Sequence, residues 1–247
     1  MERVYFPTID EALHSVGKTC DLGIIPIENT LDGYVQRTID LLSEEDVHIL
    51  NELTIPVQFS LLANVEKKED IKRLFVQFKA NGQCRHFIDT LSGISIVSTE
   101  SNMESFYKLE SGVEGDAAIV PIYIGDAADG RLRIDNVTDA ISNFTRFVII
   151  APGKTEENIC EGKGFKATIY IMPETDRPGM LFEILSGFYE KGNNLVSIIS
   201  RPTRKEMGTY NFFIEVKSGY EKSEALETVL DKLRESYGIK LFGIYSV

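Results

Sequence analysis

The segment Phe165-Lys-Ala-Thr-Ile-Tyr-Ile-Met172 alternates apolar and polar side chains, a pattern typical of a strand with one buried face. The stretch from Pro178 to Lys191 then spaces its apolar residues as a helix does, and Gly192 follows as a common helix terminus. The periodicity further predicts strands at 195–200 and 209–217, a helix at 223–237 and a last strand at 239–247. The order βαββαβ predicts a ferredoxin-like domain over residues 165–247.

A polar stretch separates this domain from the rest of the chain. Residues 152–164 read PGKTEENICEGKG, with three glycines, one proline and no hydrophobic period, so we place a linker at residues 154–164. The charge also changes there. The net charge of −12 falls entirely on residues 1–164, because acidic and basic residues balance in the remainder.

The first part, residues 1–153, reads as an α/β domain. A capping box, Thr8-x-x-Glu11, opens its first helix. Alternation of buried strands with helices predicts a largely parallel sheet, whose ligand site lies beyond the carboxyl ends of the strands. The expected strands are 22–27, 57–63, 94–97, 117–122 and 146–151, and the expected helices are 34–42, 67–75, 80–91 and 101–109.

Composition excludes several classes of protein. The chain has 247 residues, of which 43% are hydrophobic and 26% charged, as in a globular protein that builds its own core. The acidic first part lacks the basic footprint needed for nucleic acid or an anionic membrane. Three cysteines and three histidines, without metal-ligand spacing, predict neither disulfides nor a metal site. We expect a cytoplasmic protein.

One polar cluster follows the first predicted strand. It reads Pro26-Ile-Glu-Asn-Thr-Leu-Asp-Gly33, at a point where a helix is expected to begin. Free backbone N–H groups at such a junction suit a carboxylate. The alternative interpretation is an ordinary N-cap and turn, which Asn, Thr, Asp and Gly also favour.

A second cluster, Ser142-Asn-Phe-Thr-Arg-Phe147, enters the strand expected at 146–151. It sets a hydroxyl beside a guanidinium, between aromatic residues. The fork of an arginine matches a carboxylate, and a threonine can deliver a proton in a site without water. Threonine and arginine also begin many strands, so the pattern by itself is weak.

Six short motifs occur in one order along the chain: Ile24-Ile-Pro-Ile-Glu-Asn-Thr-Leu-Asp-Gly33, Thr38-Ile-Asp-Leu-Leu42, Cys84-Arg85, Asn143-Phe-Thr-Arg-Phe147, Asn194-Leu195 and Ser200-Arg-Pro202. Together they resemble prephenate dehydratase with a C-terminal ACT regulatory domain. The resemblance implies a two-lobed catalytic portion like a periplasmic binding protein, followed by a ferredoxin-like ACT domain. The implied reaction is the loss of water and carbon dioxide from prephenate, giving phenylpyruvate for L-phenylalanine biosynthesis, without a metal or other cofactor.

The resemblance also implies roles for individual residues. Thr145 would give a proton to the departing hydroxyl, and Arg146 and Phe147 would shape the substrate pocket. Asn29 and Thr30 would hold a substrate carboxylate, Thr30 replacing the serine usual in the family. The effector L-phenylalanine would be held between paired subunits of a homodimer or homotetramer, by Gly179, Met180, Leu181, Asn194, Leu195, Ser200, Arg201 and Pro202.

The sequence also departs from the family pattern. The family begins with a strand and a Gly-Pro-x-Gly-Thr-Phe loop, whereas this sequence starts near the later segment Phe6-Pro7-Thr8, so we expect an N-terminally incomplete catalytic domain. Ile199 stands where the family has an acidic residue before Ser-Arg-Pro. Two alternatives therefore stay open. One is a catalytically impaired relative that binds phenylalanine for regulation, and the other is an enzyme acting on a similar cyclic acid.

Overall fold

Two strands, β3 (Val47–Pro56) and β9 (Phe144–Pro152), carry the chain between two compact units. The first unit contains residues 1–54 and 146–247, and the second contains residues 55–145. The computed structural model describes residues 2–125, 131–140, 142–153, 164–174, 177–219 and 223–246. Most of the predicted linker at 154–164 lies outside the described residues, so the domain boundary placed there stays a prediction.

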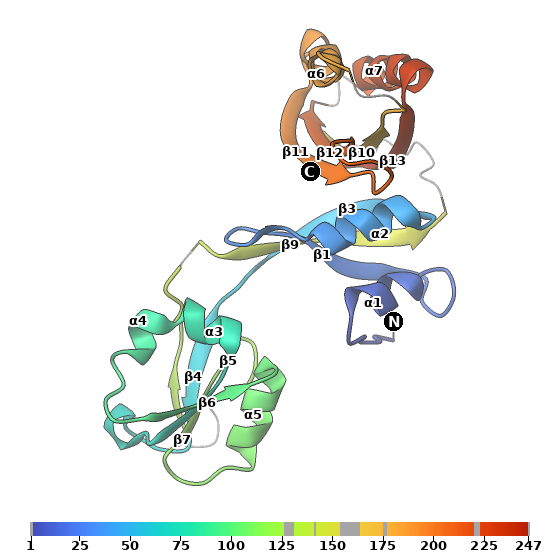
Figure 1. The fold of residues 1–247 in the computed structure, drawn as a ribbon. Coiled ribbons are helices and arrows are strands. Elements are labelled where there is room, and N and C mark those ends of the chain that lie inside the picture. The colour runs from blue at the N-terminus through green and yellow to red at the C-terminus, as the bar shows by residue number, and fades with distance from the viewer. Residues whose placement is uncertain are drawn as a thin grey trace. The chain divides into compact units, whose positions relative to one another are not determined.

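The first unit contains two four-stranded sheets (Figure 1). One has the order β2-β1-β9-β3, with β1 at Gly23–Asn29 and β2 at Gly33–Tyr34. Helices α1 (Ile9–His14) and α2 (Gln36–Glu44) pack against the strands of this sheet. The predicted N-cap is present, because the Thr8 hydroxyl accepts a hydrogen bond from the Glu11 N–H and donates one to the Glu11 carboxylate, at 3.2 Å each.

The second sheet of this unit belongs to the predicted ferredoxin-like domain, and the order βαββαβ is confirmed. Its strands run β11-β12-β10-β13, all antiparallel in their described pairs. Helices α6 and α7 pack on one face of the sheet. The elements are β10 (Phe165–Met172), α6 (Met180–Glu190), β11 (Asn194–Pro202), β12 (Tyr210–Ser218), α7 (Ser223–Ser236) and β13 (Gly238–Ser246).

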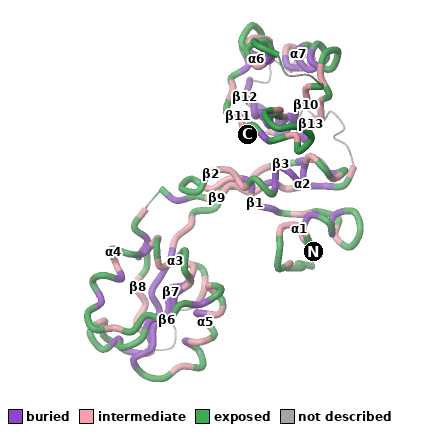
Figure 2. The backbone as a smooth tube through the Cα atoms, viewed as in Figure 1, coloured by how far each residue is buried: buried purple, intermediate pink, exposed green. Residues whose placement is uncertain are grey.

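Strand β10 is buried on both faces, not on one as its sequence pattern predicts (Figure 2). Phe165, Ala167 and Ile169 pack beneath α6 and α7. On the opposite face, Tyr170 joins a hydrophobic cluster with Ile39 of α2. Lys166 and Thr168, polar residues that a half-buried strand would expose to water, are buried as well. The reason is that the other sheet of the unit and α2 cover this second face.

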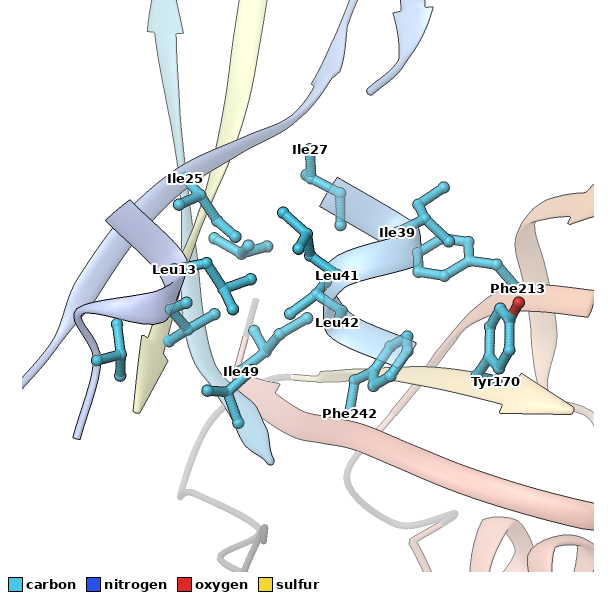
Figure 3. Packing of buried hydrophobic residues seen from close by; sticks show 14 of the residues in the cluster. Leu13, Ile25, Ile27, Ile39, Leu41, Leu42, Ile49, Tyr170, Phe213 and Phe242 are labelled. Carbon is cyan, nitrogen blue, oxygen red and sulfur yellow. The ribbon is translucent and has the colours of Figure 1, made fainter. Parts of the chain in front are cut away.

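A single hydrophobic cluster therefore joins the two sheets (Figure 3). From the ferredoxin-like domain it takes Tyr170, Phe213 and Phe242. From the first 54 residues it takes the buried faces of the two helices and of β1 and β3, including Leu13, Ile25, Ile27, Ile39, Leu41, Leu42 and Ile49. The ferredoxin-like domain thus has its own core under α6 and α7 and shares a second core with the N-terminal residues.

The second unit holds a mixed five-stranded sheet of order β6-β5-β7-β4-β8. Strand β5 pairs in parallel with β6 and β7, whereas β4 is antiparallel to β7 and β8. The predicted, largely parallel sheet is therefore mixed. The elements are β4 (Phe59–Ala63), η1 (Lys68–Asp70), β5 (Arg73–Gln77), α3 (Phe78–Gln83), α4 (Arg85–Ile88), β6 (Ser95–Thr99), α5 (Asn102–Glu110), β7 (Asp116–Pro121) and β8 (Leu132–Ile134).

One local prediction is wrong, and one strand was not predicted. The helix expected at 67–75 is a short 3₁₀ turn followed by β5, because Leu74, Phe75 and Val76 are buried in a central strand. Strand β3 carries an alternating pattern at Val47 and Ile49 that the sequence analysis did not use. None of the described helices is long and apolar enough to span a bilayer.

The shared core predicts that a single truncation in β13 destabilises the first unit strongly. Phe242 is fully buried in the shared cluster, so Phe242→Ala should lower the free energy of unfolding by about 3–5 kcal/mol in chemical denaturation. The matched control is Phe78→Ala, which removes a phenylalanine side chain that is 77% exposed and should cost less than ~0.5 kcal/mol. Similar small losses for both variants would contradict the shared core.

Candidate functional site

The predicted carboxylate-binding segment forms a tight hairpin between β1 and β2, not a strand-to-helix junction. Asn29 pairs with Gly33 across the hairpin. The Asn29 Oδ1 atom accepts hydrogen bonds from the N–H groups of Leu31 and Asp32, at 2.9 and 3.0 Å. Asn29 therefore stabilises a turn, as the alternative interpretation of this segment predicts. Thr30 lies exposed at the tip of the hairpin.

The second predicted cluster lies on β9, where Thr145, Arg146 and Phe147 follow one another and are all partly buried. Consecutive side chains of a strand point to opposite faces. Arg146 therefore points away from the face that carries Thr145 and Phe147. The boundary between the two compact units falls between Thr145 and Arg146.

The guanidinium of Arg146 is bound by three carboxylates. Its Nε donates to Glu28 at 3.0 Å, and its Nη1 donates to Glu52 at 2.8 Å. Nη1 and Nη2 also donate to the two oxygens of Glu215, at 2.8 and 2.7 Å, in a bidentate pair. Nη2 makes one more bond, to the Tyr34 hydroxyl at 3.1 Å. A substrate carboxylate would have to replace one of these partners to reach Arg146.

Glu215 belongs to β12 of the ferredoxin-like domain and is fully buried. Its carboxylate also accepts a hydrogen bond from the Tyr34 hydroxyl at 2.6 Å, and one from Thr168 at 3.5 Å. A buried carboxylate is tolerated only when it is paired and hydrogen-bonded, and this one is both. Removing one partner of such a buried pair typically costs ~3–5 kcal/mol, because an unpaired charge is left behind.

Lys166 completes the cluster by donating from Nζ to both oxygens of Glu52, at 2.8 Å each. Burial opposes ionisation of Glu52, but the hydrogen bonds from Lys166 and Arg146 outweigh it and lower the pKa of Glu52 below its usual range. Burial and the neighbouring Glu215 raise the pKa of Tyr34 well above its ordinary value. These shifts favour the ionised form of Glu52 and the protonated form of the Tyr34 phenol.

Glu52, Lys166 and Glu215 were not predicted from the sequence as members of this cluster. Glu215 and Lys166 were visible as charged residues inside strongly apolar strands, a position where charged residues are almost always paired. That pattern indicates a buried ion pair, but it does not predict which residue is the partner. Arg146 and Glu215 are 69 residues apart in the chain, and only the packing of the two sheets brings them together.

The predicted effector residues lie on α6 and β11 of the ferredoxin-like domain. Gly179 is the N-cap of α6 with φ of 85°, a left-handed conformation that favours glycine. Met180 is buried and Leu181 is half-buried, whereas Asn194, Ser200 and Pro202 are exposed on β11. Leu195 packs against the core under α6 and α7. A cavity of about 690 Å³ in this domain includes Met180 in its lining.

Arg201, another predicted effector residue, is held by the N-terminal part of the first unit. Its Nε and Nη2 donate to the two carboxylate oxygens of Asp40 on α2, at 2.9 and 2.8 Å. Its Nη1 donates to Gln36 at 2.8 Å. Contact of Arg201 with an effector stays a prediction, and the structure adds a bidentate ion pair that ties β11 to α2.

Asn193, just before β11, is buried, and neither end of its side-chain amide has a hydrogen-bond partner among the described residues. A buried amide without partners is costly, so a polar ligand that supplied them would be stabilised there. Among those same residues, no group of three His, Cys, Asp or Glu side chains is arranged to hold a metal. Burial, together with the nearby Asp139, raises the pKa of the Cys84 thiol to about 12, which disfavours a reactive thiolate.

Comparison with known proteins places these features in a family. A model of the prephenate dehydratase family matches residues 1–155, and a model of the ACT domain matches residues 174–234. The chain is 34% identical over 229 residues to prephenate dehydratase of Methanocaldococcus jannaschii, covering 92% of this chain and 81% of that protein. It is 31% identical over 232 residues to a bifunctional chorismate mutase/prephenate dehydratase of Aquifex aeolicus. That match covers 92% of this chain but only 62% of the length of the Aquifex protein.

Solved structures agree with the family match. The structure of prephenate dehydratase from Arthrobacter aurescens in complex with L-Phe has a TM-score of 0.82 at 29% identity, covering 99% of this chain and 81% of that chain. The prephenate dehydratase structure from Staphylococcus aureus has a TM-score of 0.80 at 25% identity, covering 96% and 88%. The resemblance seen in the sequence is confirmed, and the chain belongs to the prephenate dehydratase family, with an ACT domain in its C-terminal part.

Proposed function

We propose that the chain catalyses the decarboxylating dehydration of prephenate to phenylpyruvate. The observation that carries this proposal is the family match over residues 1–155, which includes both polar clusters singled out from the sequence. The curated relatives named above are themselves prephenate dehydratases, one of them bifunctional. The proposed enzyme is a carbon-oxygen lyase.

The reaction needs one proton donor and groups that hold anions. The ring carboxylate of prephenate leaves as carbon dioxide, and its bonding electrons make the ring aromatic while the ring hydroxyl is expelled. A proton delivered to that hydroxyl makes it leave as water. Atoms balance when prephenate plus one proton gives phenylpyruvate, carbon dioxide and water. No electron is lost to an acceptor, so the reaction is not a net oxidation.

We assign the proton donor to Thr145, which takes a proton back from water after each turnover. Phe147, the next side chain on the same face of β9, would form part of the pocket wall. Asn29 and Thr30 would hold a substrate carboxylate at the β1–β2 hairpin. Arg146 could take part in carboxylate binding by exchanging Glu28, the most exposed of its three carboxylate partners.

The two alternatives make different predictions about turnover. A catalytically impaired relative would bind phenylalanine but not convert prephenate. An enzyme acting on a similar cyclic acid would leave prephenate unchanged and convert another substrate. We favour prephenate dehydration, because the matched family model covers the predicted proton donor as well as the anion-binding segment.

We further propose that L-phenylalanine regulates the enzyme through the ACT domain. The structure named above of a relative with L-Phe, and the buried, unpartnered amide of Asn193 beside the predicted effector residues, support this proposal. ACT sheets commonly pair side by side, so we propose a homodimer or homotetramer. Cys20 and Cys84 are free thiols in the part of the chain that the structure describes, which suits the reducing cytoplasm.

The role of Thr145 is tested by Thr145→Val, which keeps the shape and β-propensity of the side chain but removes the hydroxyl. General acid catalysis typically contributes ~10²- to 10⁴-fold, so kcat for prephenate should fall by about that factor with KM little changed. Thr145→Ser keeps a hydroxyl and serves as the matched control, with kcat within about tenfold of the parent. Equal turnover by Thr145→Val and the parent would remove Thr145 from the mechanism.

Regulation is tested by isothermal titration calorimetry with L-phenylalanine and, as a control ligand, D-phenylalanine. We expect saturable binding of the L-enantiomer at millimolar concentration or below. Asn194→Ala should weaken it, because this substitution removes a side chain exposed on the predicted effector strand. The absence of binding by the parent at millimolar L-phenylalanine would reject the effector proposal.

Assembly is tested by analytical ultracentrifugation of the parent chain. We expect a dimer or tetramer at micromolar concentration. A single monomeric species at that concentration would contradict side-by-side pairing of the ACT sheets.

A further inference from the structure

We infer that Glu215 of the ACT domain is a positioning residue for the proton donor, acting through Arg146. Glu215 is fully buried and binds both terminal nitrogens of the Arg146 guanidinium, at 2.8 and 2.7 Å. Arg146 directly follows Thr145 on β9. The effect of Glu215 on turnover of prephenate rests on the proposed function, whereas its effect on the rigidity of β9 does not.

Glu215 differs from the other carboxylates around Arg146 in where it comes from. Glu28 lies on β1 and Glu52 on β3, the two strands that flank β9 in its own sheet. These two carboxylates would therefore move together with β9. Glu215 lies on β12 of a separate sheet. Of the carboxylate partners described, it is the one that fixes β9 against a second structural layer.

The face alternation of a strand explains how this contact would act on Thr145 without touching the substrate. Arg146 and Thr145 project to opposite faces of β9, so the ion pair holds the backbone from the face opposite the proton donor. Fixing the Arg146 side chain restricts the backbone at the adjacent residue. A proton donor displaced by about 1 Å typically costs ~10²-fold in rate.

Glu215 also connects the ACT sheet to the β1–β2 hairpin. In the pairing of β11 with β12, Glu215 lies opposite Ser197, next to an irregularity in the register between Leu195 and Ser197. Tyr34, which donates to Glu215, connects the β1–β2 hairpin to the same carboxylate. The contact is therefore shared by β9, by the hairpin that carries Asn29, and by the regulatory sheet.

Glu215→Gln is the variant that tests the inference. The cluster contains two cations, Arg146 and Lys166, and three carboxylates, so removing the charge of Glu215 leaves two carboxylates for two cations. The amide cannot form the bidentate ionic pair with the guanidinium. Glu215→Asp, which keeps the charge but shortens the side chain, provides a second variant in case the first is poorly folded.

The matched control is Asp116→Asn in the second unit. Asp116 is also buried and also binds an arginine through two nitrogens, with both Arg73 distances at 2.7 Å. It lies at the start of β7, outside the proposed site. This variant should lower stability in the same way, but it should leave the exchange of β9 amides and the kcat for prephenate as in the parent.

Two measurements on the full chain decide the inference. Hydrogen exchange should become at least about tenfold faster for peptide amides of residues 144–148 in Glu215→Gln, with no such change in Asp116→Asn. In the same variant kcat for prephenate should fall by ~10- to 10²-fold while KM changes less than about twofold. Glu215→Asp should change both quantities in the same direction by smaller factors.

Unchanged exchange at residues 144–148 would overturn the inference, and so would faster exchange with unchanged kcat. If the parent chain does not convert prephenate, the proposed function fails. The exchange measurement then still decides whether Glu215 holds β9, so failure of the function and failure of the positioning role are told apart.

Discussion

The bidentate ion pair between Arg146 and Glu215 is the contact on which the arrangement of the first unit depends. It joins β9, the strand that carries the proposed proton donor, to a fully buried carboxylate of the ACT sheet. Two charges of this kind are tolerated in a core only when every oxygen and nitrogen is bound, and Tyr34, Thr168, Glu28 and Glu52 supply the remaining bonds. The hydrophobic cluster around Phe213 and Phe242 packs the same two sheets together.

This packing changes how the chain divides. The sequence predicts a linker between a catalytic portion and a regulatory domain, and residues 1–54 and 146–247 form one compact unit. The ACT domain is therefore part of the same structural unit as Arg146, Asn29 and Thr30. The Arg201–Asp40 ion pair is a second contact of this type, between the predicted effector strand and α2. An ACT domain packed in this way can influence the strand that carries the proposed proton donor through side chains that are already in place.

Much of the fold follows from local patterns, whereas most of the charged cluster does not. Alternating and helical periodicity predicts every element of the ferredoxin-like domain, because each buries at least one face against its sequence neighbours. The same patterns fail at 67–75, where a short buried strand was taken for a helix, and at Asn29, where a hairpin replaces the expected junction. Arg146 and Thr145 could be singled out from their motif. Their partners could not, because Glu215 meets Arg146 only when two sheets distant in sequence pack together.

The proposed activity is tested most directly by turnover of prephenate by the purified full chain at neutral pH, with phenylpyruvate and carbon dioxide quantified together. We expect equal amounts of the two products, formed well above the spontaneous rate measured without protein. Prephenate that disappears no faster than in that control, with L-phenylalanine still bound, would contradict it and identify a binding protein in place of an enzyme.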